Sequence, residues 1–554
     1  MGLYLLDYGA GNVQSLANTL TKLGHEFTWI KEVADFDKAT SLIFPGVGAF
    51  ETALEHLTTR GLLEPLRAYI ASGRPYFGIC IGMQVVFQSS AESDKYQGLG
   101  VVPLPVERFD DATKAVPHIG WNTADIVQLE DEERQLDPKH YYFVHSFCAK
   151  YPTDEKAKEW VYATTQYGDE LFVSAVRKDN VFCTQFHPEK SGAAGLELVD
   201  AWLRGATSTS KSITYQTPSL RPQDGLTKRV IACMDVRAND AGDLVVTKGD
   251  QYDVREKATT SSDNTDISIH IAGAVRNLGA PLALAARYYA SGADELCLLN
   301  ITSFRQSPLH DQPMLAVVRA AASALFVPLT IGGGIKDTVD PDGTPRSAVE
   351  VAGAYFRAGA DKVSIGSDAV YAVERLRNEL GERGDGGSAI ERIAFAYGRQ
   401  AVVVSIDPRR AYVDPDTYDG PFKGEIVRGT GQEEGKAWWY QATVSGGREN
   451  RELSAVQLAQ GAEALGAGEL LLNSIDRDGT NAGFDLDLVR LVKSSVKIPV
   501  VASSGAGSAE HFTQVFGETS CEAALAAGIF HREEVKIQDV KDAMVKAGLN
   551  TRVD

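Results

Sequence analysis

The chain has 554 residues, which is too long for a single hydrophobic core and predicts two large domains. Its hydrophobic content of 44% and charged content of 23% are typical of a globular protein. Its 74 acidic residues outnumber the 55 basic ones, and the net charge of -19 argues against a general nucleic-acid or anionic-membrane surface. No apolar run reaches the roughly 18 residues that span a bilayer, and no basic leader opens the chain. The six cysteines lack C-x-x-C spacing, which is typical of free thiols. We therefore expect a cytoplasmic protein that binds neither nucleic acid nor membrane.

The first part of the chain alternates short apolar runs with helical patterns. A strand is expected at residues 3–6, followed by a helix that ends near Gly24, and a second strand at 41–44 leads into the Pro-Gly loop 45–48. Repeated units of this kind predict an open, mostly parallel sheet with flanking helices. Ligands gather at the carboxyl ends of strands in such sheets, so the loop 45–48 should border any site there.

Cys80 is the candidate nucleophile. It ends an apolar run, lies between Gly78 and Gly82, and precedes a helical pattern that extends to Phe87. This arrangement predicts a nucleophile elbow, a sharp strand-to-helix turn in which the helix N-terminus favours the thiolate. The same glycine pattern also fits a small buried cysteine packed between two glycines.

A base and a carboxylate follow about a hundred residues later. His187 comes after strand-like runs at 171–176 and 181–186, and Glu189 stands two residues beyond it. His-Pro-Glu alone would fit an ordinary loop, but together with Cys80 it predicts a thiol triad in which His187 is the base and Glu189 orients it.

The loop 45–48 also supplies a candidate oxyanion hole. The backbone N–H groups of Val47 and Gly48, together with that of Ile81 beside the nucleophile, can stabilise the charge of a thiol ester intermediate. An ordinary Pro-Gly turn would fit the same loop residues.

A polar, Gly-, Ser- and Thr-rich segment follows Arg204 and continues to Gly225, which is typical of a linker. We therefore expect a first domain at 1–204, a linker at 205–226 and a second domain at 227–554. In the second domain, eight short apolar runs alternate with helical segments and predict a (β/α)8 barrel. The expected strands are 229–235, 295–300, 328–331, 362–365, 401–406, 469–473, 499–502 and 523–526.

The eight strands fall into two similar halves offset by roughly 172 residues, which indicates a duplicated half-barrel. Each half has a small-residue strand end followed by a second small-residue loop, where backbone amides can approach an anion. The candidate phosphate-binding residues are Gly333, Gly334, Gly366 and Ser367 in the first half and Ser503, Ser504, Gly505, Ala527 and Gly528 in the second. Two such sites predict a substrate phosphorylated at both ends, although tight packing would explain either run alone. Lys248, on the loop after the first strand, is a further candidate if that loop closes, but most loop lysines are only solvated.

Asp235 and Asp407 follow the first strand of each half and should face each other across the barrel mouth, where two carboxylates suit paired acid and base work. Taken singly, each also fits a turn or helix-cap aspartate. At the opposite ends of the strands, four charged residues predict a ring of alternating sign that closes the barrel floor and, when open, admits a small neutral molecule. These are Arg229, Glu295, Lys362 and Glu469, for which an ordinary surface ring is the alternative.

Cys80, His187 and Glu189 together resemble the class I glutamine amidotransferases. The chain as a whole resembles the fused, eukaryotic-type imidazole glycerol phosphate synthases of histidine biosynthesis over nearly its full length. The motifs that carry this resemblance are FGICIGMQ at 77–84, QFHPEKS at 185–191, DKVSI at 361–365, SIDRDGT at 474–480 and SSGAG at 503–507. Asn300, Gly366 and Ser504 depart from the stand-alone bacterial pattern and resemble the fused branch.

The resemblance implies that glutamine is hydrolysed at Cys80 and that ammonia crosses the charged ring and the barrel. At the far mouth, ammonia would attack a ribulosyl formimino aminoimidazole carboxamide ribotide, a bisphosphate, with Asp235 and Asp407 in the acid–base steps. Imidazole glycerol phosphate and aminoimidazole carboxamide ribotide (AICAR) would be the products. The resemblance adds Asp478, Gly479 and Thr480 to the candidate substrate-binding residues, and it implies no metal, no organic cofactor and a monomer.

Enzymes of this family show weak glutaminase activity until the ligand of the cyclase binds, and we hypothesise that a peptide flip in the loop 45–48 then completes the oxyanion hole. One alternative is a glutaminase that feeds a different phosphorylated acceptor, as nucleotide or carbamoyl synthases do, but those need an ATP-binding module and the sequence has no G-x-x-x-x-G-K-S/T loop. A second alternative is a scaffold with decayed sites, although all five candidate catalytic residues are present.

Overall fold

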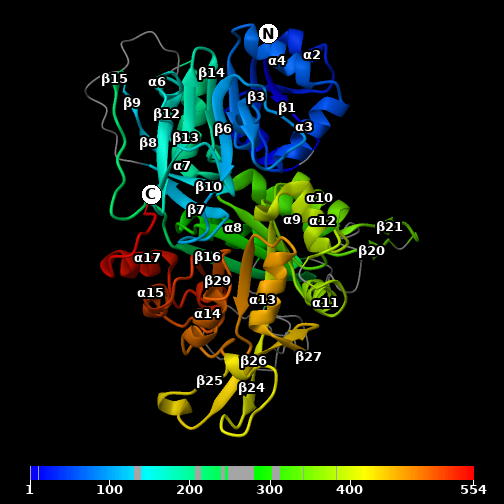
Figure 1. Ribbon diagram of the computed structural model, residues 1–554, viewed down its shortest axis with the longest axis vertical. Helices are drawn as coiled ribbons and strands as arrows, with labels where there is room; N and C mark the ends of the chain where they lie inside the picture. Colours follow the sequence, from blue (N-terminus) through cyan, green and yellow to red (C-terminus); the bar gives the residue numbers. More distant parts are fainter. Residues whose placement is uncertain are drawn as a thin grey trace, which may run out of the picture.

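The computed structural model describes residues 2–9, 11–129, 139–205, 214–238, 244–247, 280–301, 312–340, 342–381 and 383–553. Lys248 and linker residues 206–213 lie outside these ranges. In Figure 1 a sheet with its helices forms the N-terminal end of the molecule, a barrel adjoins it, and a small antiparallel sheet extends from the far end of the barrel.

The N-terminal sheet has eight strands: β1 (Gly2–Leu6), β2 (Phe27–Ile30), β3 (Ala39–Phe44), β4 (Tyr76–Ile79), β8 (Asp125–Ile126), β12 (Val161–Tyr167), β13 (Glu170–Lys178) and β14 (Val181–Thr184). Their order is β2-β1-β3-β4-β14-β13-β12-β8. The pairings from β2 to β14 are parallel and those beyond β14 are antiparallel. Every residue of the central strands β4 and β14 is buried, as expected of parallel strands covered on both faces. The predicted open sheet, parallel over its first half, is thus confirmed.

The helical segments of this part are α1 (Gln14–Lys22), α2 (Asp35–Lys38), α3 (Phe50–Thr59), α4 (Leu63–Ala71), α5 (Ile81–Gln84), α6 (Glu155–Lys158), η1 (Pro188–Lys190) and α7 (Gly192–Leu203). Smaller sheets pair β10 with β7, β11 with β6 and β5, and β15 with β9. Their bounds are β5 (Phe87–Ser90), β6 (Val102–Arg108), β7 (His118–Thr123), β9 (Gln128–Leu129), β10 (His140–His145), β11 (Phe147–Cys148) and β15 (Thr214–Tyr215).

The helix predicted to continue from Cys80 to Phe87 is much shorter than expected, because α5 ends at Gln84 and Phe87 begins β5. The carbonyl of Val85 accepts the N–H of Leu99 at 2.8 Å, and that of Val86 accepts two further N–H groups from the same segment. These long-range bonds replace the i to i+4 bonds of a longer helix.

The barrel contains the eight predicted strands, which are β16 (Arg229–Ala238), β18 (Glu295–Asn300), β19 (Leu329–Gly332), β22 (Lys362–Ile365), β23 (Val402–Ile406), β28 (Glu469–Asn473), β29 (Val500–Ser503) and β30 (Ala523–Ala526). They are parallel in chain order, and β16 also pairs with β30, which closes the cylinder. The (β/α)8 prediction is therefore confirmed. β17 (Leu244–Thr247) lies antiparallel to the extended end of β16.

Helices surround the barrel strands. They are α8 (Pro281–Ala290), α9 (Gln312–Ala324), α10 (Ala348–Ala358), α11 (Ser367–Arg375) with the π-helical turn η4 (Leu376–Leu380), α12 (Ala389–Tyr397), η5 (Arg399–Ala401), α13 (Ala455–Ala464), α14 (Leu486–Lys493), α15 (Ala509–Glu518), α16 (Gly528–His531) and α17 (Ile537–Lys546). Capping boxes at Ser347, Ser388 and Ser454 start α10, α12 and α13. No helix within the described ranges is both long and apolar enough to cross a membrane.

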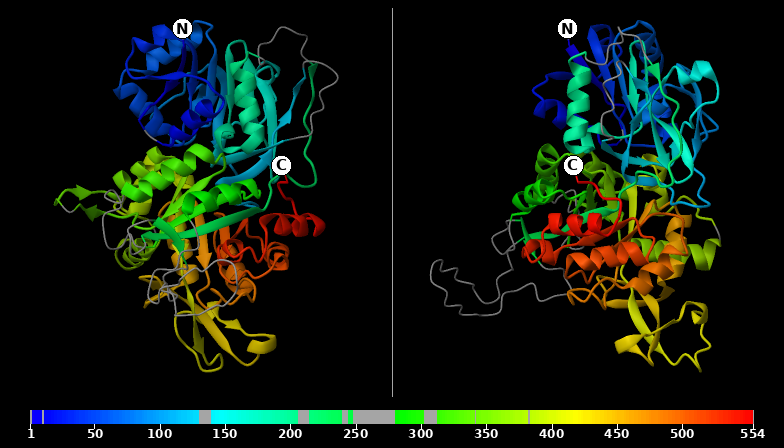
Figure 2. Two further views of the ribbon diagram at one scale, coloured as in Figure 1. Left: turned by 180° about the vertical axis from the view of Figure 1, so that it is seen from behind. Right: turned by 90° about the vertical axis from the view of Figure 1, so that its left-hand side faces the viewer.

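An antiparallel sheet follows β23 and was not predicted. It comprises β24 (Arg409–Val413), β25 (Val427–Arg428), β26 (Ala437–Val444) and β27 (Glu449–Ser454), with η6 (Lys423–Glu425) and η7 (Gly431–Glu433) between them. A two-stranded ribbon, β20 (Thr338–Val339) with β21 (Pro345–Arg346), follows β19. Figures 1 and 2 show the β24–β27 sheet at the end of the molecule farthest from the N-terminal sheet.

The N-terminal part covers the amino ends of the barrel strands (Figure 2). Trp121 Nε1 donates to the carbonyl of Asp294, immediately before β18, at 3.0 Å, and the N–H of Gly192 donates to Phe326, just before β19, at 2.9 Å. Asn12, which follows β1, donates to Asp361 just before β22. The carboxyl end of β1 therefore faces the floor of the barrel, and the barrel mouth points the opposite way.

Candidate active site

The backbone at Cys80 has the sharp turn expected of an elbow. Cys80 has φ of 50° and ψ of -102° between the end of β4 and the start of α5, and its N–H donates to the carbonyl of Thr184 at 2.7 Å. A Cβ on Gly78 would lie 2.4 Å from the Gly82 carbonyl oxygen, and one on Gly82 would lie 2.0 Å from that of Phe44. Glycine is therefore required on both sides of the thiol.

His187 and Glu189 lie beside this thiol. His187 Nδ1 is 2.8 Å from Glu189 Oε1, and the two side chains are 2% and 3% exposed. Burial alone would lower the pKa of His187, but the charges of Glu189 and Cys80 outweigh burial and raise it well above its usual value. The arrangement favours an imidazolium that can hold a proton taken from sulfur.

The candidate oxyanion loop reaches the elbow. The N–H of Ile81 points to the carbonyl of Gly46 at 3.4 Å, and a Cβ on Gly46 would meet the Ile81 side chain at 2.2 Å. The carbonyl of Val47 accepts the Tyr8 hydroxyl at 2.9 Å. Tyr8 thus holds one orientation of the Val47 peptide, whose N–H belongs to Gly48.

Sequence reasoning missed two polar residues near the thiol and a third beside the loop 45–48. Gln185 Nε2 lies 3.5 Å from Cys80 Sγ, and Gln84 Nε2 donates to Gln185 Oε1 at 3.1 Å. Glu92 accepts the N–H of Phe50 at 2.9 Å, where α3 begins after the loop 45–48. Gln84 and Gln185 lie inside the motifs already quoted, whereas nothing in the sequence distinguishes Glu92.

Four charged side chains from four barrel strands form a closed ring on the barrel floor. Arg229 is 2.6 Å from Glu295 and also pairs with Glu469, while Lys362 is 2.7 Å from Glu295 and 2.5 Å from Glu469. All four side chains are at most 2% exposed. Burial alone would raise the pKa of Glu469, but Arg229 and Lys362 outweigh it and lower the pKa.

Tyr142 links the triad to this ring. Its carbonyl accepts the N–H of His187 at 2.9 Å, while its hydroxyl is buried with no hydrogen-bond partner among the described residues. Burial and the nearby Glu295 raise the pKa of Tyr142 well above its usual value, opposed by Arg229.

A second link passes through Asp361, the residue before Lys362 of the ring. Lys190 Nζ, three residues after His187, lies 2.7 Å from Asp361 Oδ2, and Asn12 Nδ2 lies 2.8 Å from Asp361 Oδ1. The triad and the charged ring are thus connected by buried contacts.

At the barrel mouth, Asp235 lies on β16 and Asp407 follows β23. These strands are four positions apart in a closed ring of eight, so the two residues belong to opposite walls. Burial raises the pKa of Asp407, hydrogen bonds from Asn473 and Ser405 lower it in part, and the charge of Asp478 raises it further.

The small-residue loops have the backbone shapes that small side chains favour. Gly333 and Gly334 have φ of 97° and 73°, and Ser504 and Gly505 have 75° and 92°. Gly479 also has a positive φ, of 69°.

The second loop of each half leads into a helix. Gly366 precedes α11 and Ala527 precedes α16, which begins with Gly528. The hydroxyl of Ser367 accepts the N–H of Ser445 at 3.0 Å, whereas Thr480 Oγ1 donates to the Arg477 carbonyl at 2.8 Å. Ser503 is the last residue of β29.

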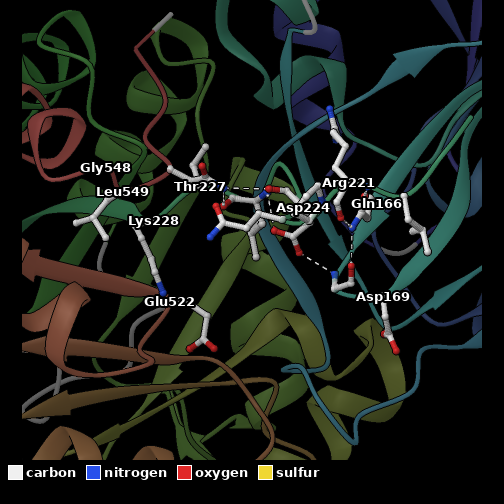
Figure 3. A pocket seen from close by; sticks show the side chains of 15 residues that line it. Gln166, Asp169, Arg221, Asp224, Thr227, Lys228, Glu522, Gly548 and Leu549 are labelled. Atoms are coloured by element: carbon white, nitrogen blue, oxygen red, sulfur yellow. Dashed lines mark hydrogen bonds between the residues drawn. The ribbon is translucent and has the colours of Figure 1, made fainter.

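A cavity of about 620 Å³ lies where the linker meets both parts, and Figure 3 shows its lining. None of the predicted site residues lines it. Its polar groups bond one another: the N–H of Arg221 donates to Gln166 Oε1 at 2.7 Å, and that of Gly168 donates to Asp224 at 2.7 Å. We interpret this cavity as part of the joint between the linker and both parts.

Comparison with known proteins matches both parts of the chain. Residues 4–202 match the family described as Glutamine amidotransferase class-I, and residues 229–536 match the family described as Histidine biosynthesis protein. The chain is thus an enzyme that joins a class I glutamine amidotransferase to a histidine-biosynthesis barrel.

Full-length relatives define the family more closely. The chain is 50% identical over 559 residues to "Imidazole glycerol phosphate synthase hisHF" of Emericella nidulans, which covers 99% of this chain and 98% of the relative. It is 52% identical over 544 residues to the protein of the same name from Schizosaccharomyces pombe, with 97% of each chain covered. It is 50% identical over 551 residues to the chloroplastic hisHF protein of Arabidopsis thaliana, covering 99% of this chain and 89% of the relative. The chain belongs to the fused imidazole glycerol phosphate synthase hisHF family.

Proposed function

We propose that the chain is a bifunctional imidazole glycerol phosphate synthase that acts in histidine biosynthesis. It hydrolyses glutamine, passes the ammonia through its barrel and uses it to convert the bisphosphorylated formimino ribotide to imidazole glycerol phosphate and AICAR. The observation that carries this proposal is the position of a thiol triad against the barrel floor, with two opposed aspartates at the barrel mouth.

The glutaminase step uses the triad. His187 takes the proton of Cys80 Sγ, and the thiolate attacks the side-chain carbonyl of glutamine to form a thioester. The N–H groups of Gly48 and Ile81, with the loop at Val47, stabilise the oxyanion. His187 returns its proton to the leaving ammonia, and water then hydrolyses the thioester to glutamate.

The cyclase step takes place at the far end of the barrel. Ammonia passes the ring when at least one of its ion pairs separates, and it then travels along the inside of the barrel to the mouth. Asp235 and Asp407 give and take protons, while the small-residue loops, Lys248 and the segment Asp478 to Thr480 bind the bisphosphate substrate.

We further propose that residues 1–204 form the glutaminase, 205–226 the linker and 227–554 the cyclase, and that the protein acts as a cytoplasmic monomer. Because one chain carries both activities, no partner subunit is needed. Size-exclusion chromatography with light scattering tests the monomer.

Substitution of the nucleophile tests the whole scheme. Cys80→Ala should abolish formation of imidazole glycerol phosphate from glutamine, yet retain most of the turnover with ammonium salt, as followed by mass spectrometry. Cys148→Ala, a matched change at another buried thiol, should retain both activities.

The alternatives give different results in the same assay. A glutaminase for another acceptor would release glutamate but form no imidazole product with either nitrogen source. A decayed scaffold would do neither.

A further inference from the structure

The Asp407 carboxyl is held through one oxygen by two side chains. Asn473 Nδ2 donates to Asp407 Oδ1 at 2.7 Å, and Ser405 Oγ donates to the same oxygen at 3.3 Å. Asn473 Nδ2 also donates to Ser405 Oγ at 3.1 Å, which closes a triangle of polar groups. Among the described residues, no side chain donates to Asp407 Oδ2. One oxygen of the carboxyl is therefore fixed and the other is left for a ligand.

The main chain of Asp407 is fixed as well. Thr443, buried on β26, donates its hydroxyl to the Asp407 carbonyl at 2.6 Å. The unpredicted β24–β27 sheet therefore helps to hold this aspartate, and β23 and β28 supply the residues that hold its carboxyl. A carboxyl restrained in this way presents one oxygen in a constant direction.

The positions that match Asn473 and Ser405 in the first half of the barrel carry other residue types. The β16–β18 register places Leu299 opposite Asp235, and Cys233 stands two residues before that aspartate. The β23–β28 register ends with Ile406 opposite Leu472, so the next pair in the second half is Asp407 with Asn473. The two halves thus carry the same aspartate but differ at both flanking positions.

We propose that Asn473, assisted by Ser405, is a positioning residue of the cyclase reaction that fixes Asp407 through Oδ1, so that Oδ2 is the atom that exchanges a proton with the bisphosphate substrate. This inference rests on the proposed function. Because Oδ1 already accepts two hydrogen bonds, a proton on the Asp407 carboxyl resides on Oδ2. The two aspartates therefore have different residues beside their carboxyl groups. Paired acid and base roles require such different environments, because one carboxyl must give a proton while the other takes one.

Asn473→Leu tests the proposal, because it keeps the approximate volume and copies the first half. The ammonia-dependent cyclase reaction is measured from pH 6 to pH 9. The variant should lower kcat roughly 10- to 100-fold while KM for the bisphosphate changes less than about threefold. The Asn473 amide lowers the pKa of Asp407. Loss of the amide should therefore shift the part of the pH profile that reports Asp407 to higher pH.

Further variants separate positioning from folding. Asn473→Thr keeps a hydroxyl donor and should recover most of kcat, whereas Ser405→Ala should shift the profile in the same direction by less. Asn378→Leu makes the same change at an exposed position of η4 and should match the wild type. If Asn473→Leu fails to fold, Ser405→Ala supplies the same readout.

Two outcomes would overturn the inference alone: an unchanged pH profile in both Asn473→Leu and Ser405→Ala, or a rise in KM with kcat preserved. A wild-type protein that forms no imidazole product from ammonia would overturn the proposed function and this inference with it. An Asp407→Asn variant with wild-type turnover would remove the catalytic role of Asp407 and the need for its positioning.

Discussion

The turn at Cys80 could be predicted from single residues, but the hydrogen bonds around it could not. The two flanking glycines predicted its turn, and the close contacts at both glycine positions explain why larger residues would not fit. The Tyr8 hydroxyl on the Val47 carbonyl joins residues 39 positions apart and left no sequence signal. Local backbone demands are visible in residue types, whereas tertiary hydrogen bonds of common residues are not.

Glu92 should make stability depend on pH. Burial raises its pKa from 4.5 to about 7, which exceeds the opposing effect of the Phe50 N–H. Between these pH values the folded state retains a proton that the unfolded state has lost, so stability falls as pH rises through this window. Above pH 7 the loss is about 3 kcal/mol at most, since Glu92 is only partly buried.

Glu92→Gln removes this titration and should therefore stabilise the protein at pH 8 much more than at pH 4.5. Thermal unfolding at the two pH values measures the difference. Glu64→Gln, at a largely exposed carboxylate, is the matched control and should change little at either pH. An equal effect of Glu92→Gln at both pH values would contradict the prediction.

Tyr8→Phe should raise glutaminase activity in the absence of the cyclase ligand. The hydroxyl stabilises one orientation of the Val47 peptide by roughly 1 kcal/mol, so its removal should favour the flip and raise basal glutamate release about two- to tenfold. Release in the presence of the ligand should change little. Tyr69→Phe, which removes a similar hydroxyl bond to the Pro75 carbonyl, is the control. A basal rate equal to that of the wild type would show that the Tyr8 hydroxyl does not restrain the Val47 peptide.

At the scale of elements, the barrel strands were predictable because each is a short apolar run between turn residues, and their repetition fixed the number. The sheet β24–β27 was missed because its strands mix polar and aromatic residues, and β25 has only two residues. The end of α5 was missed because distant N–H groups, which local periodicity does not reveal, take its carbonyls.

Arg229→Met should destabilise the barrel floor. The variant leaves two carboxylates, Glu295 and Glu469, paired with one cation of the ring, Lys362. One negative charge is then buried without a partner in the ring, which should lower the free energy of unfolding by about 3–5 kcal/mol. The melting temperature should fall by several degrees, and less imidazole product should form per glutamate if ammonia escapes. Arg375→Met, which breaks an exposed ion pair with Asp385, should change stability by less than about 1 kcal/mol. A ring variant as stable as the wild type would show that the ring charges are not needed for stability.

At the scale of the whole molecule, Asp361 is a buried meeting point between the N-terminal part and the barrel. Asn12 and Lys190 both reach Asp361, across 349 and 171 residues of sequence. The motifs predicted that a thiol site and a barrel must cooperate, but not which residues join them, because these contacts exist only once both parts have folded.

Asp361→Asn should leave the Lys190 ammonium, 3% exposed, without its carboxylate and cost about 3–5 kcal/mol. Lys190→Met should cost less, because Asp361 keeps hydrogen bonds from Asn12 and the Leu329 N–H. The double variant should be more stable than the sum of the two single effects predicts, by about 1–3 kcal/mol. Denaturant unfolding of the four proteins measures this coupling, and strict additivity would contradict a direct pairing.

The charged ring has a consequence for how such a barrel can have arisen. Three of its members, Arg229, Glu295 and Lys362, come from the first repeat and only Glu469 from the second, in which Ala401 and Ala523 occupy the positions that match Arg229 and Lys362. An ancestor assembled from two copies of the first repeat would have buried twice as many cations as anions. The present repeats have become complementary in electric charge, so a chimera with two identical repeats should fold poorly even where every backbone contact is kept.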